Sequence, residues 1–213
     1  GVDGLLISPS FDGANIKYLN QVIEERIPTV VFDRINEQLN TSQIASDNFL
    51  GGKMAAEHIL SKGMKKVLLI GVQKAWLSKE RIRGFLSCFP VDTNNYSHSI
   101  FLDVELSLLE QLEVIFDREL SLTDFDAIYA TTDTLTLTVL RFLKRLDIYL
   151  PVIGFCNNDF SDILYGQPVT IIQPSKDLGE LASQKLLSAI QNKEKPNQEI
   201  IYLPTHLKDN SYH

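Results

Sequence analysis

Residues 44–71 decide the fold, and they read IASDNFLGGKMAAEHILSKGMKKVLLIG. The stretch predicts a short strand ending at Ser46, then a helix whose apolar stripe consists of Met54, Ala55, Ile59 and Leu60. Gly63 supplies the positive φ that ends the helix. Residues 67–70, VLLI, are apolar at every position, as expected of a parallel strand covered on both faces. One βα unit that leads directly into another strand predicts an α/β fold.

The turn before this helix carries Asp47 and Asn48. Asn48 is predicted to be the N-cap, because its side-chain oxygen can accept a hydrogen bond from the free amides of the first turn. Gly51 and Gly52 follow in the first helical turn, where close backbone packing is a better explanation than a phosphate site. The polar turn is a natural edge for a ligand.

Composition limits the possible functions. The 213 residues carry a net charge of -7, which argues against this chain itself gripping nucleic acid. We find no apolar run of membrane-spanning length and no signal segment, so we expect a cytoplasmic protein without a membrane partner. Cys88 and Cys156 lack metal-type spacing and are expected to be buried thiols, although a disulfide is possible. No nucleotide, metal or catalytic motif is present, so we expect no cofactor and no enzyme activity.

Strands and helices alternate along the rest of the chain, which predicts parallel sheets with right-handed crossovers. Trp76 falls in a predicted loop, residues 72–77, and a polar tail follows the last strand. Strands are predicted at the start of the chain and at residues 28–33, 97–103, 125–130, 150–155, 169–173 and 199–203, and helices at residues 14–26, 78–89, 105–116, 133–146, 158–164 and 175–191.

Polar groups follow nearly every predicted strand. Ligands in open α/β sheets bind outside the carboxyl ends of the strands. The residues at these positions are Ser8, Asp33, Asp47, the loop of Trp76, residues 131–133, residues 156–158 and Gln173. Their convergence predicts a site for a small polar ligand.

Eight segments, in order along nearly the whole chain, resemble the effector-binding core of the LacI/GalR family of bacterial transcription regulators, which is similar to the periplasmic sugar-binding proteins. They are VDGLLISP, IPTVVFDR, SDNFLGGKMAAEHILSKGMKKVLLIG, ERIRGF, the acid Asp133 opening its helix, VIGFCNN, PVTIIQPSKDLGELASQKLL and YLPTHL.

The resemblance implies a two-lobed, periplasmic-binding-protein-like (type I) fold with three chain crossings, near residues 47–48, 172–173 and 192–197. One lobe would comprise residues 1–47 and 173–192, and the other residues 48–172 and 198–213. The family's DNA-binding helix-turn-helix and its first two βα units have no counterpart in this chain. We therefore expect a fragment of a longer regulator, with a three-stranded first lobe that has an exposed sheet edge.

A sugar-like effector needs planar, charged or amide groups that serve two hydroxyls at once, and an apolar platform. Arg81 matches the family's effector-binding arginine; the alternative is a solvated helix arginine. Asp33 can accept from a hydroxyl or pair with Arg34. Trp76 can stack on a pyranose or belong to the core.

The remaining candidates follow later strands. Thr132 and Asp133 match an effector-contacting region of the family, although Asp133 can simply be an N-cap. Asn157 is a capable reader of hydroxyls, whereas Cys156 is a poor one and stands where the family often has an aspartate. Gln173 lies at an expected crossing, or is a turn amide before Pro174.

The resemblance implies a homodimeric regulator whose carbohydrate effector changes the affinity for operator DNA, through a helix-turn-helix outside this chain. A periplasmic sugar-binding protein of a transporter is the alternative, and a small α/β enzyme is a third class.

Overall fold

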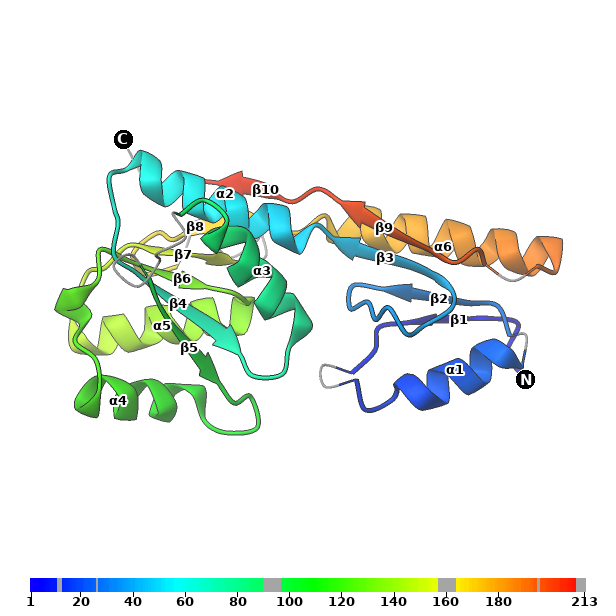
Figure 1. Ribbon diagram of the computed structural model, residues 1–213, viewed down its shortest axis with the longest axis horizontal. Coiled ribbons are helices and arrows are strands. Elements are labelled where there is room, and N and C mark those ends of the chain that lie inside the picture. Colours follow the sequence, from blue (N-terminus) through cyan, green and yellow to red (C-terminus); the bar gives the residue numbers. More distant parts are fainter. Residues whose placement is uncertain (11–12, 26, 90–96, 157–163, 195, 210–213) are drawn as a thin grey trace. The chain divides into compact units, whose positions relative to one another are not determined.

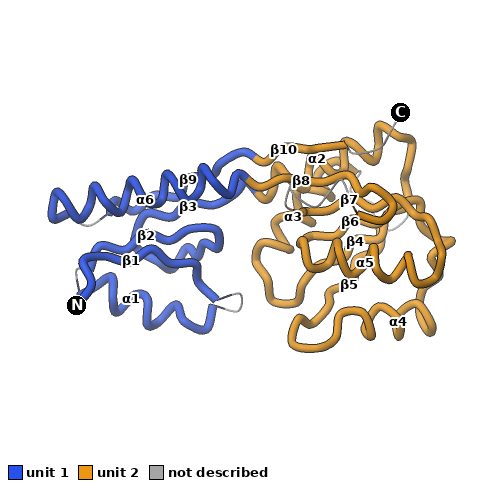
Figure 2. Tube along the Cα trace, turned by 180° about the vertical axis from the view of Figure 1, so that it is seen from behind, with its two compact units in different colours: residues 1–47, 174–204 blue, residues 48–173, 205–213 orange. Residues whose placement is uncertain are grey.

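A computed structural model describes residues 1–10, 13–25, 27–89, 97–156, 164–194 and 196–209 (Figure 1). Unit 1 consists of residues 1–47 and 174–204, and unit 2 of residues 48–173 and 205–213 (Figure 2). The chain therefore passes from one unit to the other after Asp47, after Gln173 and after Pro204.

The third crossing differs from the expected one, because residues 198–204 belong to unit 1. Strand β9 (Glu199–Leu203) pairs in parallel with β3 (Ser42–Ser46) along its whole length. Its side chains Ile201 and Leu203 pack into the apolar cluster under helix α6 (Ser175–Asn192). Pairing and burial thus hold the strand in the first unit until Pro204.

Four parallel strands form the sheet of unit 1, in the order β1-β2-β3-β9. The prediction of a three-stranded sheet was wrong because it omitted β9. Strand β1 (Leu5–Ile7) pairs only with β2 (Thr29–Phe32) among the described strands, so it forms a sheet edge, and Leu6 on it is 37% exposed.

Two helices cover opposite faces of this sheet (Figure 1). Helix α1 (Ile16–Glu24) packs with Val31, and α6 packs with the neighbouring Val30. Successive strand side chains point to opposite faces, which is why β2 is buried on both sides.

The sheet of unit 2 has the order β10-β8-β7-β6-β4-β5, and only β10 is antiparallel. Residues 206–208 were predicted as polar tail but form β10 against β8, a short pairing without an apolar signature. The strands are β4 (Val67–Val72), β5 (Ser97–Leu102), β6 (Ala127–Ala130), β7 (Val152–Phe155), β8 (Val169–Ile172) and β10 (His206–Lys208).

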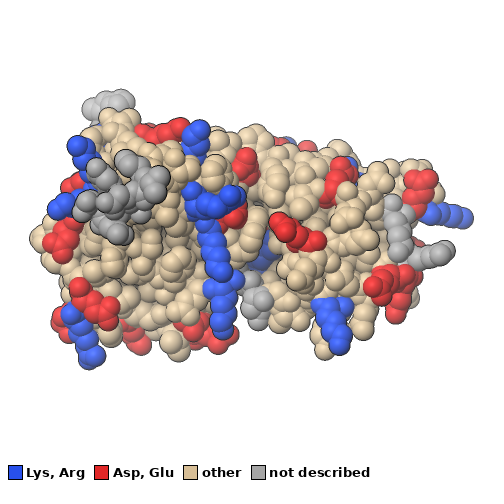
Figure 3. Space-filling view, viewed as in Figure 1, with Lys and Arg blue, Asp and Glu red and all other residues tan. Residues whose placement is uncertain are grey.

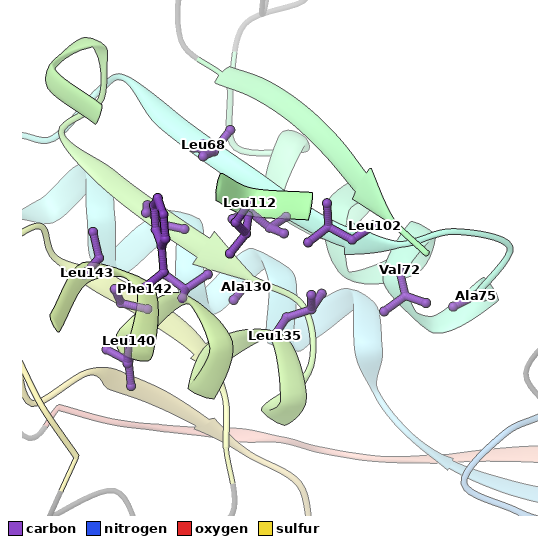
Figure 4. Close-up of a cluster of buried hydrophobic side chains, with 14 residues drawn as sticks. Leu68, Val72, Ala75, Leu102, Leu112, Ala130, Leu135, Leu140, Phe142 and Leu143 are labelled. Carbon is purple, nitrogen blue, oxygen red and sulfur yellow. The ribbon is translucent and has the colours of Figure 1, made fainter. Parts of the chain in front are cut away.

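Strand β4 is buried at every residue, as predicted, and separates two cores. Leu68 packs into the cluster shown in Figure 4, under α4 (Leu108–Arg118) and α5 (Asp133–Leu146). Leu69 packs into the second cluster, under α2 (Asn48–Ser61) and α3 (Trp76–Leu86). A 3-10 turn (Leu122–Asp124) precedes β6.

Helices α2 and α3 cross at a pair of glycines. A Cβ on Gly52 would lie 1.9 Å from the carbonyl oxygen of Arg81, and one on Gly84 would lie 2.0 Å from that of Phe49. This confirms close backbone packing at Gly52. As predicted, α2 ends before Gly63, which has φ +75°.

Charge of both signs covers the face shown in Figure 3, where Lys and Arg side chains gather in one column over unit 2 with acidic side chains around it. Some of the exposed cations on α2 and α3 pair locally, Lys53 with Glu57 and Arg83 with Glu80.

Candidate functional site

The carboxyl ends of four neighbouring parallel strands, β8, β7, β6 and β4, share one edge of the unit 2 sheet. Most of the residues predicted from sequence lie at or beside this edge: Trp76, Arg81, Thr132, Asp133, Cys156 and Gln173. Asp33 and Arg34 belong to unit 1, and Asn157 lies outside the described residues.

Arg81 is 3% exposed and joins three elements at this edge. Its Nε donates to Oδ1 of Asn48 at 2.7 Å, and its Nη1 donates to the carbonyl of Thr131. The guanidinium carbon lies 3.4 Å from the centre of the Phe155 ring. These contacts exclude a solvated helix arginine and fix the plane of the guanidinium.

Asn48 is the first helical residue of α2, not its cap, and is 3% exposed. The N-cap prediction was wrong because the side-chain oxygen accepts from Arg81 instead. The charged guanidinium of Arg81 makes a stronger hydrogen bond than a neutral backbone amide does. This accounts for the bond of the Asn48 oxygen to Arg81 rather than to the first turn of α2.

Two buried hydroxyls connect the start of α3 to the sheet. Ser78 Oγ and Thr131 Oγ1 lie 2.8 Å apart, and the amide of Val72 donates to Ser78 Oγ at 3.1 Å. Thr131 stands at a predicted strand end, but neither Thr131 nor Ser78 was among the predicted site residues. No local pattern indicates this contact, since the two residues are 53 positions apart.

Thr132 caps α5, because its Oγ1 accepts from the amide of Leu135 at 3.2 Å. The alternative that Asp133 is the N-cap is therefore wrong. Asp133 is the first helical residue and is exposed, so its carboxylate stands at the positive end of the helix dipole.

Cys156 and Trp76 complete this edge. Cys156 follows β7, is 6% exposed, and its amide donates to the carbonyl of Ile171 at 3.3 Å. Trp76 begins α3 rather than lying in a loop, and is half-buried. Both cysteines are free; Cys88 is only half-buried, and desolvation raises the pKa of its thiol.

In unit 1 the backbone bends sharply after β2. Asp33 has φ 65°, a left-handed conformation that aspartate tolerates better than most residues. Its carboxylate lies 3.9 Å from Arg34 Nε, as the pairing alternative predicted, and Arg34 Nη1 donates to the carbonyl of Pro9 at 3.1 Å.

Ser8 follows β1 at the same edge of the unit 1 sheet. Its hydroxyl is buried and has no hydrogen-bond partner among the described residues. Buried hydroxyls usually have a hydrogen-bond partner, so the Ser8 hydroxyl is a further candidate for a ligand contact. Its position directly after a strand is the sequence feature that already indicated this.

The unit 2 edge offers hydroxyl, thiol, amide, carboxylate, guanidinium and indole groups. Such a mixture suits a small hydroxylated molecule, each of whose hydroxyls both donates and accepts. Within the described ranges, no group of three or more His, Cys, Asp or Glu side chains is arranged to hold a metal ion. No described helix is long and apolar enough to cross a membrane.

Two α/β units joined by three chain crossings, with polar strand ends, define the class of periplasmic-binding-protein-like proteins. The family with a periplasmic binding protein domain matches residues 1–194, and the chain belongs to this family. This confirms the expected fold and resemblance.

The relatives are regulators and binding proteins. The sucrose operon repressor of Lactococcus lactis is 29% identical over 210 residues, covering 95% of this chain and 64% of the repressor. The ribose import binding protein RbsB of Bacillus subtilis is 31% identical over 203 residues, covering 86% of this chain and 62% of RbsB. The chain thus spans less than two thirds of these curated relatives.

Solved structures agree on the fold. A LacI family transcriptional regulator from Enterococcus faecalis with bound ribose has a TM-score of 0.80 at 23% identity, covering 98% of this chain and 76% of the regulator. A periplasmic binding protein/LacI transcriptional regulator from Alkaliphilus metalliredigens, complexed with D-xylulofuranose, has a TM-score of 0.74 at 28% identity, covering 97% and 76%.

Proposed function

We propose that this chain is the effector-binding core of a LacI-type transcriptional regulator and that its effector is a small carbohydrate. The observation that carries the proposal is the group of polar residues at the carboxyl ends of β4, β6, β7 and β8, around the fixed guanidinium of Arg81. Asp133, Thr132, Gln173 and Trp76 serve as ligand contacts in unit 2, and Asp33 and Arg34 are the candidate contacts of unit 1 taken by itself.

The chemistry of these groups supports a hydroxylated ligand. The Asp133 carboxylate can accept from two neighbouring hydroxyls, and the guanidinium of Arg81 has five N–H donors in all, two of which bond Asn48 and Thr131. Trp76 offers an apolar face to a sugar ring. Several similar proteins hold ribose, xylulose or cellobiose, according to their descriptions.

The regulatory step is a shift between two states of the core. An effector favours one state only by its difference in affinity for the two. A coupling of about 1–3 kcal/mol changes operator affinity roughly 5- to 150-fold. Operator DNA would be bound by a helix-turn-helix elsewhere in the regulator, in the cytoplasm.

A sugar-binding protein that serves a transporter is the second candidate, favoured by the 31% identity to the ribose import binding protein. The coding sequence upstream of Gly1 distinguishes the two. A helix-turn-helix there supports the regulator, and a signal peptide supports the transport protein.

A thermal-shift screen with ribose, xylose, glucose, cellobiose and sucrose tests the ligand class. A sugar at 100 times its Kd adds about 2.7 kcal/mol to the stability of the folded state. At roughly 2–4 °C per kcal/mol, the Tm should rise by about 5–10 °C. No shift with any sugar contradicts the proposal.

The exposed carboxylate of Asp133 provides the residue test, because its removal should leave the fold intact. Asp133→Ala should weaken binding of the responding sugar about tenfold or more in calorimetry, the loss of one charged hydrogen bond. Asp117→Ala, which removes another exposed carboxylate on α4, is the control and should bind as the parent does.

A homodimer is part of the proposal. Val104 and Leu106, just before α4, are 50% and 61% exposed, and Leu137, in the second turn of the neighbouring helix α5, is 44% exposed. Apolar side chains gathered on adjacent elements are typical of association surfaces.

A further inference from the structure

A polar cavity of about 140 Å³ lies within unit 1, at the amino-terminal ends of β3 and β9. It is open to solvent on one side and bounded by the last two turns of α6 and the segment that follows them. The lining residues are Ser42, Lys185, Ser188, Ala189, Asn192, Glu194, Pro196, Asn197 and Glu199.

An ion pair forms the floor of this cavity. Lys185 Nζ lies 2.7 Å from Glu199 Oε1, which also accepts from Ser42 Oγ at 3.4 Å. The two side chains are 29% and 39% exposed, so both remain partly accessible to a ligand from solvent. The charges of Lys185 and Glu199 cancel each other. The exposed Glu194 at the rim directly follows Lys193, which has the opposite charge, so the cavity has little net charge.

The wall that follows α6 is tied to the helix. Lys193 has φ 55°, and its amide donates to the carbonyl of Ile190, while that of Glu194 donates to Ala189 at 3.0 Å. This left-handed cap positions the start of the outer wall beside Ser188 and Asn192. The hydrogen bonds of the cap therefore hold the start of this wall, Lys193 and Glu194, against α6.

The lining mixes donors and acceptors. Lys185 has three N–H donors, of which one faces Glu199, and Asn192 and Asn197 each carry both an amide donor and a carbonyl acceptor. Ser188 Oγ accepts from Asn192 Nδ2 at 3.4 Å and keeps its own O–H to donate. Hydroxyl groups, each of which both donates and accepts, match such a lining.

Size restricts the ligand further. The cavity volume is several times the volume that one water molecule occupies in the liquid, about 30 Å³. It falls below the roughly 300–1,000 Å³ of sites for drug-sized ligands. A molecule of three or four carbons is therefore the right size.

We propose that this cavity is a second binding site, separate from the strand-end site, for small neutral polyols such as glycerol and erythritol. The vicinal hydroxyls bind Lys185, Glu199 and Ser188. The site lies at the amino ends of its strands, whereas the carbohydrate site proposed above lies at carboxyl ends, so this inference does not depend on that function.

A titration of the ¹⁵N-labelled chain with erythritol, followed by amide chemical shifts, tests the proposal. We expect saturable shifts centred on Ser42, Lys185, Ser188 and Glu199, with a Kd on the order of 1–10 mM for so small a ligand. Ser188→Phe, which fills the mouth, should weaken binding at least tenfold. Gln184→Phe, at an exposed position of the same helix outside the lining, should not.

Lys185→Met keeps an unbranched side chain that reaches the Cε position but removes the ammonium. It therefore tests the floor of the cavity independently of the mouth and should also weaken binding. Non-saturable shifts, or shifts retained in Ser188→Phe and Lys185→Met, overturn the proposal. So does a response of the lining to ethanolamine but not to erythritol, because that would make the site one for cations.

Discussion

At the scale of single residues, Arg81 has a structural function that its sequence motif does not indicate. The motif predicted a ligand contact, and the structure adds a buried guanidinium bonded to Asn48 and Thr131 and stacked on Phe155. If Arg81 were only a ligand contact, its removal would spare the fold. Burial overturns this, because truncation leaves two hydrogen-bonding groups without their charged donor.

Arg81→Ala should therefore destabilise the protein by about 2–4 kcal/mol, the range for removing one member of a buried charged network. The measurement is urea unfolding of the ligand-free chain. Arg83→Ala is the matched control on the same helix, because Arg83 is 65% exposed and should change stability by no more than about 0.5 kcal/mol. Equal stabilities of the two variants would contradict the structural function of Arg81.

His58 introduces a dependence on pH. Desolvation lowers its pKa, nearby Asp209 raises it, and Lys62 lowers it. The Asp209 carboxylate lies 3.9 Å from the imidazole and 3.7 Å from the Lys62 ammonium. The unfolded chain therefore binds the proton more readily, so the stabilising contribution is complete above the ordinary pKa near 6.5 and is lost as pH falls through the lowered folded value.

We expect the Tm of the parent to fall more steeply than that of His58→Gln between pH 7 and pH 5. His98→Gln, at an exposed position on β5, serves as the control and should keep the slope of the parent. If Tm depends on pH with the same slope in all three proteins, His58 is not a cause of the loss of stability at low pH.

At the scale of elements, the contact of α2 with α3 depends on the absence of two Cβ atoms. Gly84→Ala would place a methyl group 2.0 Å from a backbone oxygen, which no side-chain rotation relieves. The helices must separate, at a cost of about 1–3 kcal/mol. Gly179→Ala is the control on α6, where a Cβ meets nothing within 4 Å, and should stabilise by up to about 1 kcal/mol. In urea unfolding, a lower free energy of unfolding for Gly84→Ala and a higher one for Gly179→Ala would verify the close crossing of α2 and α3. Stabilisation by both substitutions would refute it.

Elements with strong local signals were predicted well. The continuous apolar run of β4, the stripe of α6 and the glycine after α2 each specify a structure within a few residues. By contrast, β9 carries no local sign of which sheet it joins, since its partner β3 is 157 residues away. The short polar β10 gives no periodic pattern at all.

The site shows the same limit. Strand ends follow from apolar runs, so Thr132, Cys156 and Gln173 were placed at one edge by a topological rule. The contacts of Arg81 with Asn48 and Thr131 span 33 and 50 residues, and depend on the crossing of α2 and α3. The sequence indicates which types of side chain lie at the site. Packing determines which of these side chains already form hydrogen bonds with other parts of the protein.

At the scale of the whole molecule, self-association is the property that a regulator needs and a monomeric transport protein does not, because two operator half-sites need two readers. Leu106 is the most exposed of the three apolar residues Val104, Leu106 and Leu137. If this surface pairs two copies, Leu106→Glu places a charge in a desolvated contact, which is strongly unfavourable.

Sedimentation velocity over a range of concentrations should show a monomer–dimer equilibrium for the parent. Leu106→Glu should raise its Kd by about tenfold to a hundredfold, since burying one leucine contributes about 1.5–3 kcal/mol. Leu187→Glu, at a position 56% exposed on α6, is the control and should leave the equilibrium unchanged. A parent that stays monomeric at every concentration would count against dimerisation of this core, and equal effects of the two variants would place the interface elsewhere. Either result bears on the interface alone, since the sugar screen tests ligand binding independently.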